Sequence, residues 1–589
     1  MIRIQSIIVL SGLAVIALLT GCNQALPVDT SYSVHRDHTP ILKYKDHNPI
    51  LQIQVVHSGH EPAQLSEITL SFGGNATSDD VAGIQAWYMG SSDRWGLTEE
   101  AIAVGSAHSF AKIQTITGEQ MLDLDTSYFM ITCDLTEDAD LQHGLEVQCQ
   151  GIKVNQYNLS SSPLDQSHFI QRFGVSVRKH LDDHVDTYRI PGLVTTKAGS
   201  LLAIYDVRRE KSRDLQGDID IGVSRSTDRG NTWEPMRIAL DRGTWGGLPE
   251  KFNGISDACI LVDDKAGTIY VAGLWMYGVL DADGRWIEGL TEDSTAWAHQ
   301  WKGRASQPGF DVKETSQFLL THSDDDGLTW SEPVNLTALC KKEEWWLWAP
   351  APGHGITLDD GTLVFPSQGR DKNGEPFSNI TYSQDQGKTW KTSNPAYSNT
   401  TENMAVQLSD GSIMLNMRYN PNRSNLGEDN GRVICITDDL GKTWKEHPTS
   451  RHALIEPTCM ASIHKHPYQV YGMTSEMLFF SNPNSKQGRT HMTLKASLDD
   501  GNTWPEKYWF LLDENKGRGY SCITSIDEQT IGILYEGSQA DMTFEQIPVI
   551  ELLHRGDRNA EGCRIRMRIG GETPSLYSDG PPARKKTTG

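Results

Sequence analysis

Short apolar runs separated by polar turns recur along most of the chain, and this pattern is typical of β-strands joined by tight loops. Between residues 173 and 555 the runs come in pairs, such as Arg189-Ile-Pro-Gly-Leu-Val followed ten residues later by Gly199-Ser-Leu-Leu-Ala-Ile. Six such pairs occur in this range, so each unit has about 64 residues, which suits a four-stranded sheet with its loops. Six such sheets predict a six-bladed β-propeller.

Five copies of a second pattern mark the same units. Each copy has Ser or Thr, then Asp two residues later, Gly two residues after that and a closing Thr-Trp pair, and the copies begin at Ser226, Ser323, Ser383, Thr437 and Ser497. The Asp can accept backbone N–H bonds across a turn, the Gly supplies a positive φ, and the Trp packs back on the sheet. We expect each copy to follow the third strand of a blade, on the rim away from any active site. The sixth unit, around Tyr520, has no copy.

Residues 28–172 lack this repeat but keep the strand pattern, with Gly, Asn and Asp at the intervening turns. We interpret them as a separate β-sandwich domain. With a propeller over residues 173–555, the chain is predicted to be all-β. The remaining residues, 556–589, are rich in Gly, Pro and basic side chains, and we expect most of this tail to be disordered.

The first 22 residues have the pattern of an export signal. Arg3 precedes an apolar run, residues 7–19, that is too short for a transmembrane helix. The run ends in Leu19-Thr-Gly-Cys22, which looks like the cleavage box of a bacterial lipoprotein; the alternative is a plain secretory signal with a chance cysteine. The lipoprotein interpretation makes Cys22 a lipidated membrane anchor. Because Asn23 rather than Asp follows, no inner-membrane retention signal is evident, and we expect an outer-membrane protein, periplasmic or at the cell surface.

The composition narrows the possible partners. The chain has 53 Lys and Arg against 76 Asp and Glu, a formal charge of −23, which argues against a nucleic-acid partner. An anionic substrate therefore needs a local cluster of basic residues. The cysteines other than Cys22 show no CxxC pair and no His/Cys ligand spacing, so we expect no metal site. Cys133 and Cys149 could pair in an oxidising compartment.

Blade geometry places a set of polar residues together. Strands in a blade are antiparallel, so the starts of first strands and the ends of second strands share one rim. These positions, with a residue eight before the fifth repeat, hold Arg189, Asp206, Asp257, Gln368, Glu402, Arg418, Arg489, Tyr520 and Glu536. Three arginines at equivalent positions in an acidic protein predict a carboxylate or phosphate site, because guanidinium has forked donors and a fixed charge. Opposite Glu402, which can accept its proton, Tyr520 is a candidate nucleophile.

Each of these residues also has a plain structural interpretation. A lone arginine at a strand end is usually part of a surface salt bridge, and Tyr520 alone would be a packing residue. Asp214, in the loop after Arg208, would by itself be a solvated charge. Beside the other candidates at the mouth of the propeller, it could act as an acid in the reaction. Two Trp-rich stretches, residues 275–301 and 345–348, could form a sugar-stacking platform or could be core aromatics.

The sequence resembles bacterial exo-α-sialidases (neuraminidases) of glycoside hydrolase family 33. The run Tyr188-Arg-Ile-Pro191 is similar to that family's Arg-Ile-Pro signature, and the five repeats resemble its Asp-boxes, also called BNR repeats. The N-terminal segment resembles the β-sandwich domain that precedes the propeller in some gut-bacterial sialidases. The resemblance implies hydrolysis of terminal sialic acid from glycoproteins, glycolipids and oligosaccharides, without a cofactor or a metal ion.

The resemblance also implies a role for each candidate. The residues that would bind the sugar are Arg189, Arg418 and Arg489 for its carboxylate, Glu536 behind Arg189, and Arg208 and Asp257 for its O4 and N-acetyl side. Tyr520 would be the nucleophile of a retaining double displacement, Glu402 its base and Asp214 the general acid/base. Two alternatives stay open, namely a trans-sialidase that passes sialic acid to another sugar or to an internal hydroxyl, and a non-catalytic Asp-box propeller that binds glycans or acts as a scaffold.

Overall fold

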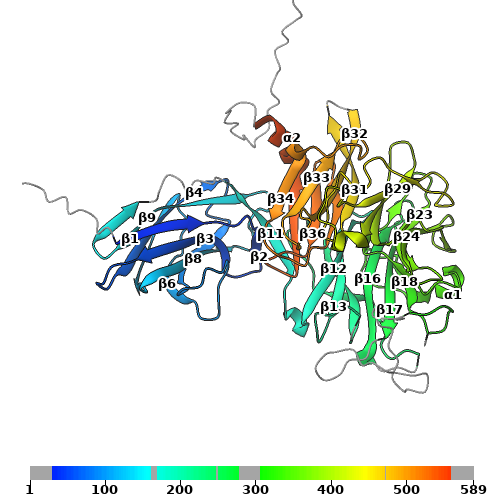
Figure 1. Ribbon diagram of the computed structural model, residues 1–589, viewed down its shortest axis with the longest axis horizontal. Coiled ribbons are helices and arrows are strands. Elements are labelled where there is room, and N and C mark those ends of the chain that lie inside the picture. The colour runs from blue at the N-terminus through cyan, green and yellow to red at the C-terminus, as the bar shows by residue number, and fades with distance from the viewer. Residues whose placement is uncertain are drawn as a thin grey trace, which may run out of the picture.

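The computed structural model describes residues 29–558, apart from 161–168, 216, 247–249, 278–305, 313 and 471–472. The expected signal with Cys22, most of the first Trp-rich stretch and nearly all of the expected tail lie outside the described residues. The described chain is almost entirely β-structure. It forms an N-terminal sandwich and a propeller that lie side by side (Figure 1).

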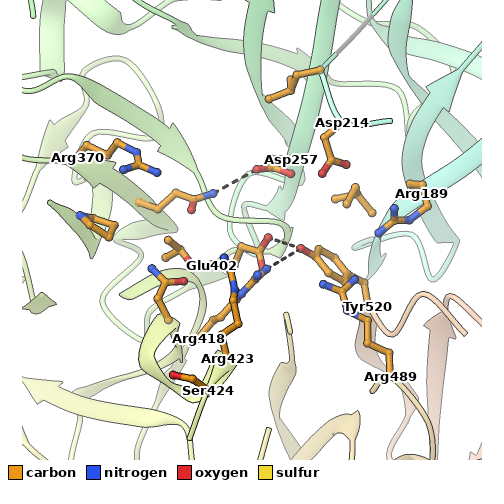
Figure 2. A pocket seen from close by; sticks show the side chains of 16 residues that line it. Arg189, Asp214, Asp257, Arg370, Glu402, Arg418, Arg423, Ser424, Arg489 and Tyr520 are labelled. Atoms are coloured by element: carbon orange, nitrogen blue, oxygen red, sulfur yellow. Dashed lines mark hydrogen bonds and ion pairs between the residues drawn. The ribbon is translucent and has the colours of Figure 1, made fainter. Parts of the chain in front are cut away.

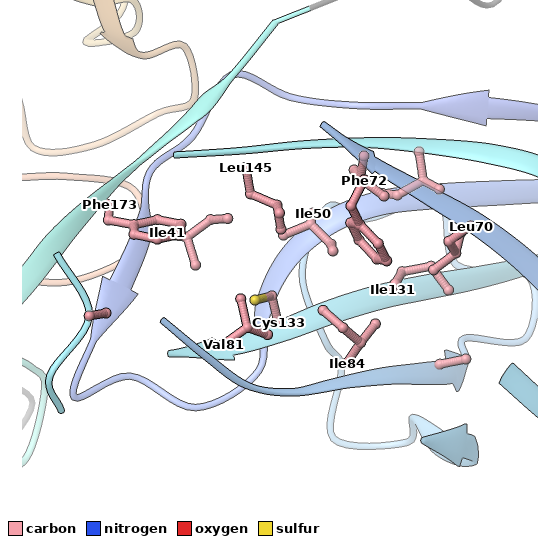
Figure 3. Packing of buried hydrophobic residues seen from close by; sticks show 14 of the residues in the cluster. Ile41, Ile50, Leu70, Phe72, Val81, Ile84, Ile131, Cys133, Leu145 and Phe173 are labelled. Carbon is pink, nitrogen blue, oxygen red and sulfur yellow. The ribbon is translucent and has the colours of Figure 1, made fainter. Parts of the chain in front are cut away.

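The N-terminal unit is a sandwich of two sheets, as the strand pattern predicted. One sheet has the order β1-β3-β8-β5-β6, formed by β1 (Thr30–His35), β3 (Asn48–His57), β8 (Asp125–Leu135), β5 (Val81–Tyr88) and β6 (Ile102–Ala107). The other contains β10 (Tyr157–Ser160), β9 (Gly144–Val154), β4 (Gln64–Gly74) and β7 (Ile113–Met121). Side chains alternate along the strands, so apolar residues of both sheets, such as Leu70 and Ile131, meet between them (Figure 3).

The second sheet of the sandwich continues into the propeller through β11 (Gln171–Arg178). The first two residues of β11 pair with β9, and Val175 pairs with Phe544 of β37 (Met542–Pro548) in the propeller. Residues 173–175 of β11 also pair in parallel with β2 (Ile41–Lys43). The boundary that we expected between residues 172 and 173 therefore falls inside a strand that both units share.

The propeller has six antiparallel blades, which confirms the predicted fold class. Blades one and two are β12 (Thr187–Thr195), β13 (Leu201–Arg208), β14 (Ile219–Ser226) and β15 (Arg237–Leu240), then β16 (Asn253–Val262), β17 (Ile269–Tyr277), β18 (Gln317–Ser323) and β19 (Val334–Asn335). Blade three has its innermost strand broken into β20 (Leu347–Pro350), β21 (Gly353–His354) and β22 (Ile356–Thr357), followed by β23 (Leu363–Arg370), β24 (Pro376–Ser383), β25 (Lys391–Thr392) and β26 (Tyr397–Ser398).

The chain then closes the ring. Blades four and five are β27 (Thr400–Gln407), β28 (Ile413–Tyr419), β29 (Val433–Thr437) and β30 (Lys445–Glu446), then β31 (Ser462–Val470), β32 (Met473–Pro483), β33 (Met492–Ser497) and β34 (Trp509–Asp513). Blade six combines β35 (Ser521–Asp527), β36 (Thr530–Tyr535) and β37 with β11, so its fourth strand comes from the N-terminal side. Two helices, α1 (Thr337–Cys340) and α2 (Val549–Arg558), follow β19 and β37. Neither described helix is long and apolar enough to cross a bilayer.

Each of the five repeats joins the third and fourth strands of a blade, as predicted. In the second copy, the Asp325 carboxylate accepts the backbone N–H of Thr329 at 2.9 Å and the hydroxyl of the same residue at 2.6 Å. These hydrogen bonds lower the pKa of Asp325 to about 2. Gly327 has a φ of 81°, which a residue with a Cβ adopts only with strain. The repeats are therefore turn-forming elements.

Burial decides the possible disulfide and the role of three tryptophans. Cys133 and Cys149 are both buried free thiols, so the possible disulfide is not formed. Trp348 is fully buried and stacks on Phe318 with ring centroids 4.3 Å apart, and Trp275 is fully buried as well. Trp345 is also in the core. These three tryptophans are packing residues rather than a sugar platform.

Candidate active site

The innermost strands of three blades are irregular where they reach the mouth of the propeller. Their pairing with the second strand shifts register at equivalent places, namely Arg189–Gly192, Ser256–Cys259 and Thr400–Asn403. Ile190 and Asp257, inside two of these shifts, have left-handed backbone with φ of 62° and 54°. Such bulges re-aim side chains that a regular strand would send to alternating faces. As a result Arg189, Asp257 and Glu402 line one cavity.

This cavity has a volume of about 800 Å³ and is lined by most of the predicted site residues. Its lining includes seven of the nine predicted catalytic and sugar-binding residues, namely Arg189, Asp214, Asp257, Glu402, Arg418, Arg489 and Tyr520 (Figure 2). The other two, Arg208 and Glu536, are buried behind the lining and hold parts of it in place. No three His, Cys, Asp or Glu side chains in the described ranges gather as ligands of a metal ion would.

Glu536 links two of the lining residues. Its carboxylate lies 2.5 Å from Nε of Arg189 and accepts the backbone N–H groups of Ile190 and Tyr520, each at 3.0 Å. Burial alone would raise the pKa of Glu536, but the charge of Arg189 and these hydrogen bonds together lower it. The carboxylate therefore stays ionised and fixes Arg189 relative to Tyr520.

Tyr520 lies at the centre of the cavity. Its hydroxyl donates to Oε1 of Glu402, while Nη1 of Arg418 lies 2.6 Å from Oε2 of the same carboxylate and 3.2 Å from the Tyr520 hydroxyl. The guanidinium groups of Arg189 and Arg489 lie 5.6 and 5.3 Å from the ring centroid. Burial, and then the charge of Glu402, raise the pKa of Tyr520 well above its usual value, against the opposing charges of Arg418 and Arg489. The resting residue is a neutral phenol with a proton acceptor in contact.

Asp214 projects into the cavity from the loop after β13. Its side chain is 61% exposed, and Oδ1 lies 2.6 Å from Nη1 of Arg208. Partial burial would raise the pKa of Asp214, but the charges of Arg208, Arg189 and Arg489 together lower it. Arg208 itself is 0% exposed and also lies 2.8 Å from Asp206, so it supports Asp214 from beneath the cavity surface.

Asp257 has the opposite electrostatic setting. Burial, and then the charge of Glu402, raise its pKa well above the usual value. One carboxylate oxygen lies 3.4 Å from Nε2 of Gln368, which also lines the cavity. The cavity thus holds ionised Asp214 together with an Asp257 that favours the protonated form.

Two cationic residues of the cavity lining, Arg370 and Arg423, were not among the predicted ones. Arg370 is the last residue of β23, two positions after Gln368, so the alignment of blades contained a signal for it. Arg423 belongs to the short 3₁₀ turn Asn420–Arg423 after β28. This turn lies outside the aligned strand positions, so the alignment of blades gave no signal for Arg423.

Comparisons with known proteins agree with this geometry. Residues 199–533 match a family described as "BNR repeat-like domain", and residues 29–158 match the "N-terminal domain of BNR-repeat neuraminidase". Together the fold and the matches define a BNR-repeat propeller of the neuraminidase class.

Individual relatives narrow this class. A sialidase of Bacteroides fragilis is 37% identical over 90% of this chain and 97% of its own length. A sialidase of Paraclostridium sordellii is 29% identical over 60% of this chain and 81% of its own length. The solved structure of a Hadza microbial sialidase is 38% identical, covers 88% of this chain and 99% of its own, and superposes with a TM-score of 0.79. The chain belongs to the sialidase family of glycoside hydrolases.

Proposed function

We propose that this sialidase releases terminal sialic acid from glycoconjugates by a retaining double displacement with Tyr520 as the nucleophile. The main support for the proposal is the Tyr520–Glu402 hydrogen bond in a cavity whose five lining arginines include Arg189, Arg418 and Arg489. Sialic acid bears a carboxylate on its anomeric carbon, and guanidinium groups hold carboxylates with forked, charge-assisted hydrogen bonds. Arg189, Arg418 and Arg489 would therefore bind the anion beside the nucleophile.

The neutral phenol suits this substrate. A carboxylate nucleophile would be repelled by the carboxylate on the reacting carbon, whereas a tyrosine approaches without charge. During attack the Tyr520 oxygen forms a bond to the anomeric carbon and its proton passes to Glu402, which already accepts its hydrogen bond. Arg418, 3.2 Å from the hydroxyl, would stabilise negative charge that develops on the oxygen.

Asp214 would protonate the leaving oxygen. In the free protein neighbouring arginines keep its pKa low, so it is ionised. A bound substrate carboxylate would offset the charges of Arg189 and Arg489, and the pKa of Asp214 would rise toward the protonated form that a general acid requires. In the second step Asp214 would take a proton from the water that attacks the anomeric carbon, the bond to the Tyr520 oxygen would break, and Glu402 would return its proton to that oxygen. Sialic acid is then released with its original anomeric configuration.

The test is Tyr520→Phe, which removes only the hydroxyl. We expect the rate on a 4-methylumbelliferyl sialoside to fall by about three orders of magnitude or more. Sialic acid binding, measured by calorimetry, should persist because the arginines remain. Near-normal turnover would contradict the proposal. In the wild type, NMR should detect the α-anomer as the first product, and added lactose would reveal any transfer of sialic acid to a sugar acceptor.

We also propose that the protein is an exported lipoprotein anchored in the outer membrane through Cys22. The pattern of residues 1–22 supports this. Labelled palmitate should enter the wild type in a bacterial host but not a Cys22→Ser variant, and equal labelling of both would contradict the anchor.

A further inference from the structure

A second cavity of about 340 Å³ adjoins the active site. Its lining shares Arg418, Arg423, Ser424 and Arg489 with the larger cavity. The rest of its wall comes from the loops that follow β28, precede β31 and join β32 to β33, and it includes Lys486. We call this space the basic cavity.

The basic cavity is positively charged in a protein of net charge −23. Its lining has four cationic side chains, Arg418, Arg423, Lys486 and Arg489, and no carboxylate. Arg418 is compensated by Glu402, but among the described residues the other three form no ion pair. Nζ of Lys486 donates instead to the carbonyl oxygen of Gly427 at 2.6 Å. Such a local excess of positive charge attracts an anion.

Two buried polar groups of the wall are left without hydrogen-bond partners among the described residues. Thr458 is 4% exposed, and its hydroxyl has no partner. Its φ of 54° is unusual for a β-branched residue, so the backbone is strained here. Asn422 is 1% exposed; its amide N–H groups donate to Gly431 and Glu456, but its Oδ1 accepts nothing. A buried polar group without a partner needs a local explanation, such as backbone strain or an ordered water, and the strained backbone at Thr458 provides one here.

The position of the basic cavity relates it to the leaving group. This step rests on the proposed function, in which Arg418 and Arg489 hold the sialic acid carboxylate. That carboxylate and the glycosidic oxygen are bonded to the same carbon, so the leaving sugar begins close to these two arginines. The carboxylate of the terminal sialic acid would pair with the arginines that bind it, and Arg423 and Lys486 remain without an anion.

We propose that the basic cavity is a leaving-group subsite for an anionic sugar, one that carries a carboxylate or a sulfate next to the terminal sialic acid. Arg423 and Lys486 would bind its charge. A sialic acid linked to a second sialic acid has this chemistry, and so does a sialylated sulfated sugar.

The test compares substrates that differ only in the leaving group. The kcat/KM for an α2,8-linked sialic acid dimer is divided by that for sialyllactose, whose lactose leaving group is neutral, in the wild type and in Lys486→Glu. Lys486 is half-buried in a loop, so the variant should fold. We expect the ratio to fall by about tenfold or more in the variant. The matched control is Lys442→Glu, an exposed lysine on the Asp-box rim, which should keep the wild-type ratio.

Salt gives a second measurement on the wild type. Because added salt weakens the attraction between exposed charges, the ratio should fall with ionic strength in the wild type and hardly change in Lys486→Glu. A sulfated sialyllactose replaces the dimer in a parallel series, and a fall in either series supports an anion subsite. A ratio that differs by less than about twofold between wild type and Lys486→Glu in both series would overturn the subsite. Failure of the wild type to hydrolyse any of these substrates would instead contradict the proposed function.

Discussion

At the scale of single residues, the three arginines of the mouth are compensated unequally. Glu536 pairs with Arg189, and Glu402 pairs with Arg418. Arg489 donates to the carbonyl oxygen of Arg518 and forms no ion pair with a described carboxylate. This set of three arginines therefore has one uncompensated positive charge, which matches a ligand with a single carboxylate. Buried charges are stable only when paired, so two of the arginines are held in place before any ligand arrives.

This arrangement predicts proton uptake on binding. Neighbouring arginines hold the pKa of Asp214 below its usual value in the free protein, and an anion bound to Arg189 and Arg489 raises it. At a pH between the pKa of Asp214 in the free protein and its pKa in the complex, binding of sialic acid should be accompanied by uptake of a proton. Calorimetry at mildly acidic pH, in buffers of different ionisation enthalpy, measures this number. Uptake should disappear in Asp214→Asn, and unchanged uptake in that variant would assign the proton to another group.

At the scale of the element, blade five contains a buried lysine that the proposed mechanism does not use. Lys495, in β33, is fully buried and donates to Asn484 at 2.9 Å. Its ammonium group lies 4.5 Å from the centroid of the Trp509 ring. Burial lowers the pKa of Lys495 from 10.5 to about 7, because desolvation disfavours the charged form. The strand thus includes a destabilising group at neutral pH.

Lys495→Met should therefore stabilise the protein. Between about pH 7 and about pH 10.5 the unfolded chain holds one more proton at this site than the folded protein, so wild-type stability rises with pH. The gain from the substitution should be largest below about pH 7 and should shrink by about 1.4 kcal/mol per pH unit above it. Denaturant unfolding at several pH values measures this, with exposed Lys442→Met as the control. A gain that does not vary with pH would contradict the buried-charge explanation.

At the scale of the whole molecule, β11 makes the sandwich and the propeller one continuous structure. Phe173 and Val175 are buried in a single cluster that contains side chains of both units. Between them, a Cβ on Gly174 would lie 2.8 Å from the carbonyl oxygen of Phe544 and 3.0 Å from the Leu42 side chain. Since these two atoms belong to different units, the junction has no room for a larger residue.

Gly174→Val should consequently destabilise both units together, by about 1–3 kcal/mol. Differential scanning calorimetry should show one transition that moves to lower temperature as a whole. Gly83→Val is the control, because a Cβ there meets nothing closer than 3.7 Å in a strand of the sandwich. Two separate transitions, of which only one shifts, would show that the units unfold independently.

Much of the mouth could be predicted because a propeller repeats. The spacing of strand pairs aligned Arg189, Glu402, Arg418 and Tyr520 at one rim, and the structure brings them into one cavity. The turn repeats made this alignment possible, since their Asp and Gly residues identify the end of each third strand. The residue types then indicated the ligand, because clustered guanidinium groups in an acidic chain are typical of a site that binds a carboxylate or a phosphate.

The remaining features could not be predicted, because they depend on contacts made outside the repeated positions of the blades. The burial of Arg208 beneath Asp214 follows from local loop packing, and the basic cavity comes from irregular loops after β28 and between β32 and β33. The fourth strand of blade six pairs Val175 with Phe544, which are far apart in sequence, so no local pattern could reveal it. Bulges at the innermost strands were likewise invisible in the apolar pattern, although they aim the site residues.

The proposed mechanism requires a covalent bond between Tyr520 and the anomeric carbon. A sialosyl fluoride with a second fluorine at C3 tests it most directly, because fluoride leaves readily while the C3 fluorine slows release of the adduct. Mass spectrometry of the digested protein should find one added fluorosialyl group, on Tyr520, and none in Tyr520→Phe. A label on Glu402 or Asp214 instead, or turnover of the probe with inverted configuration, would contradict the account.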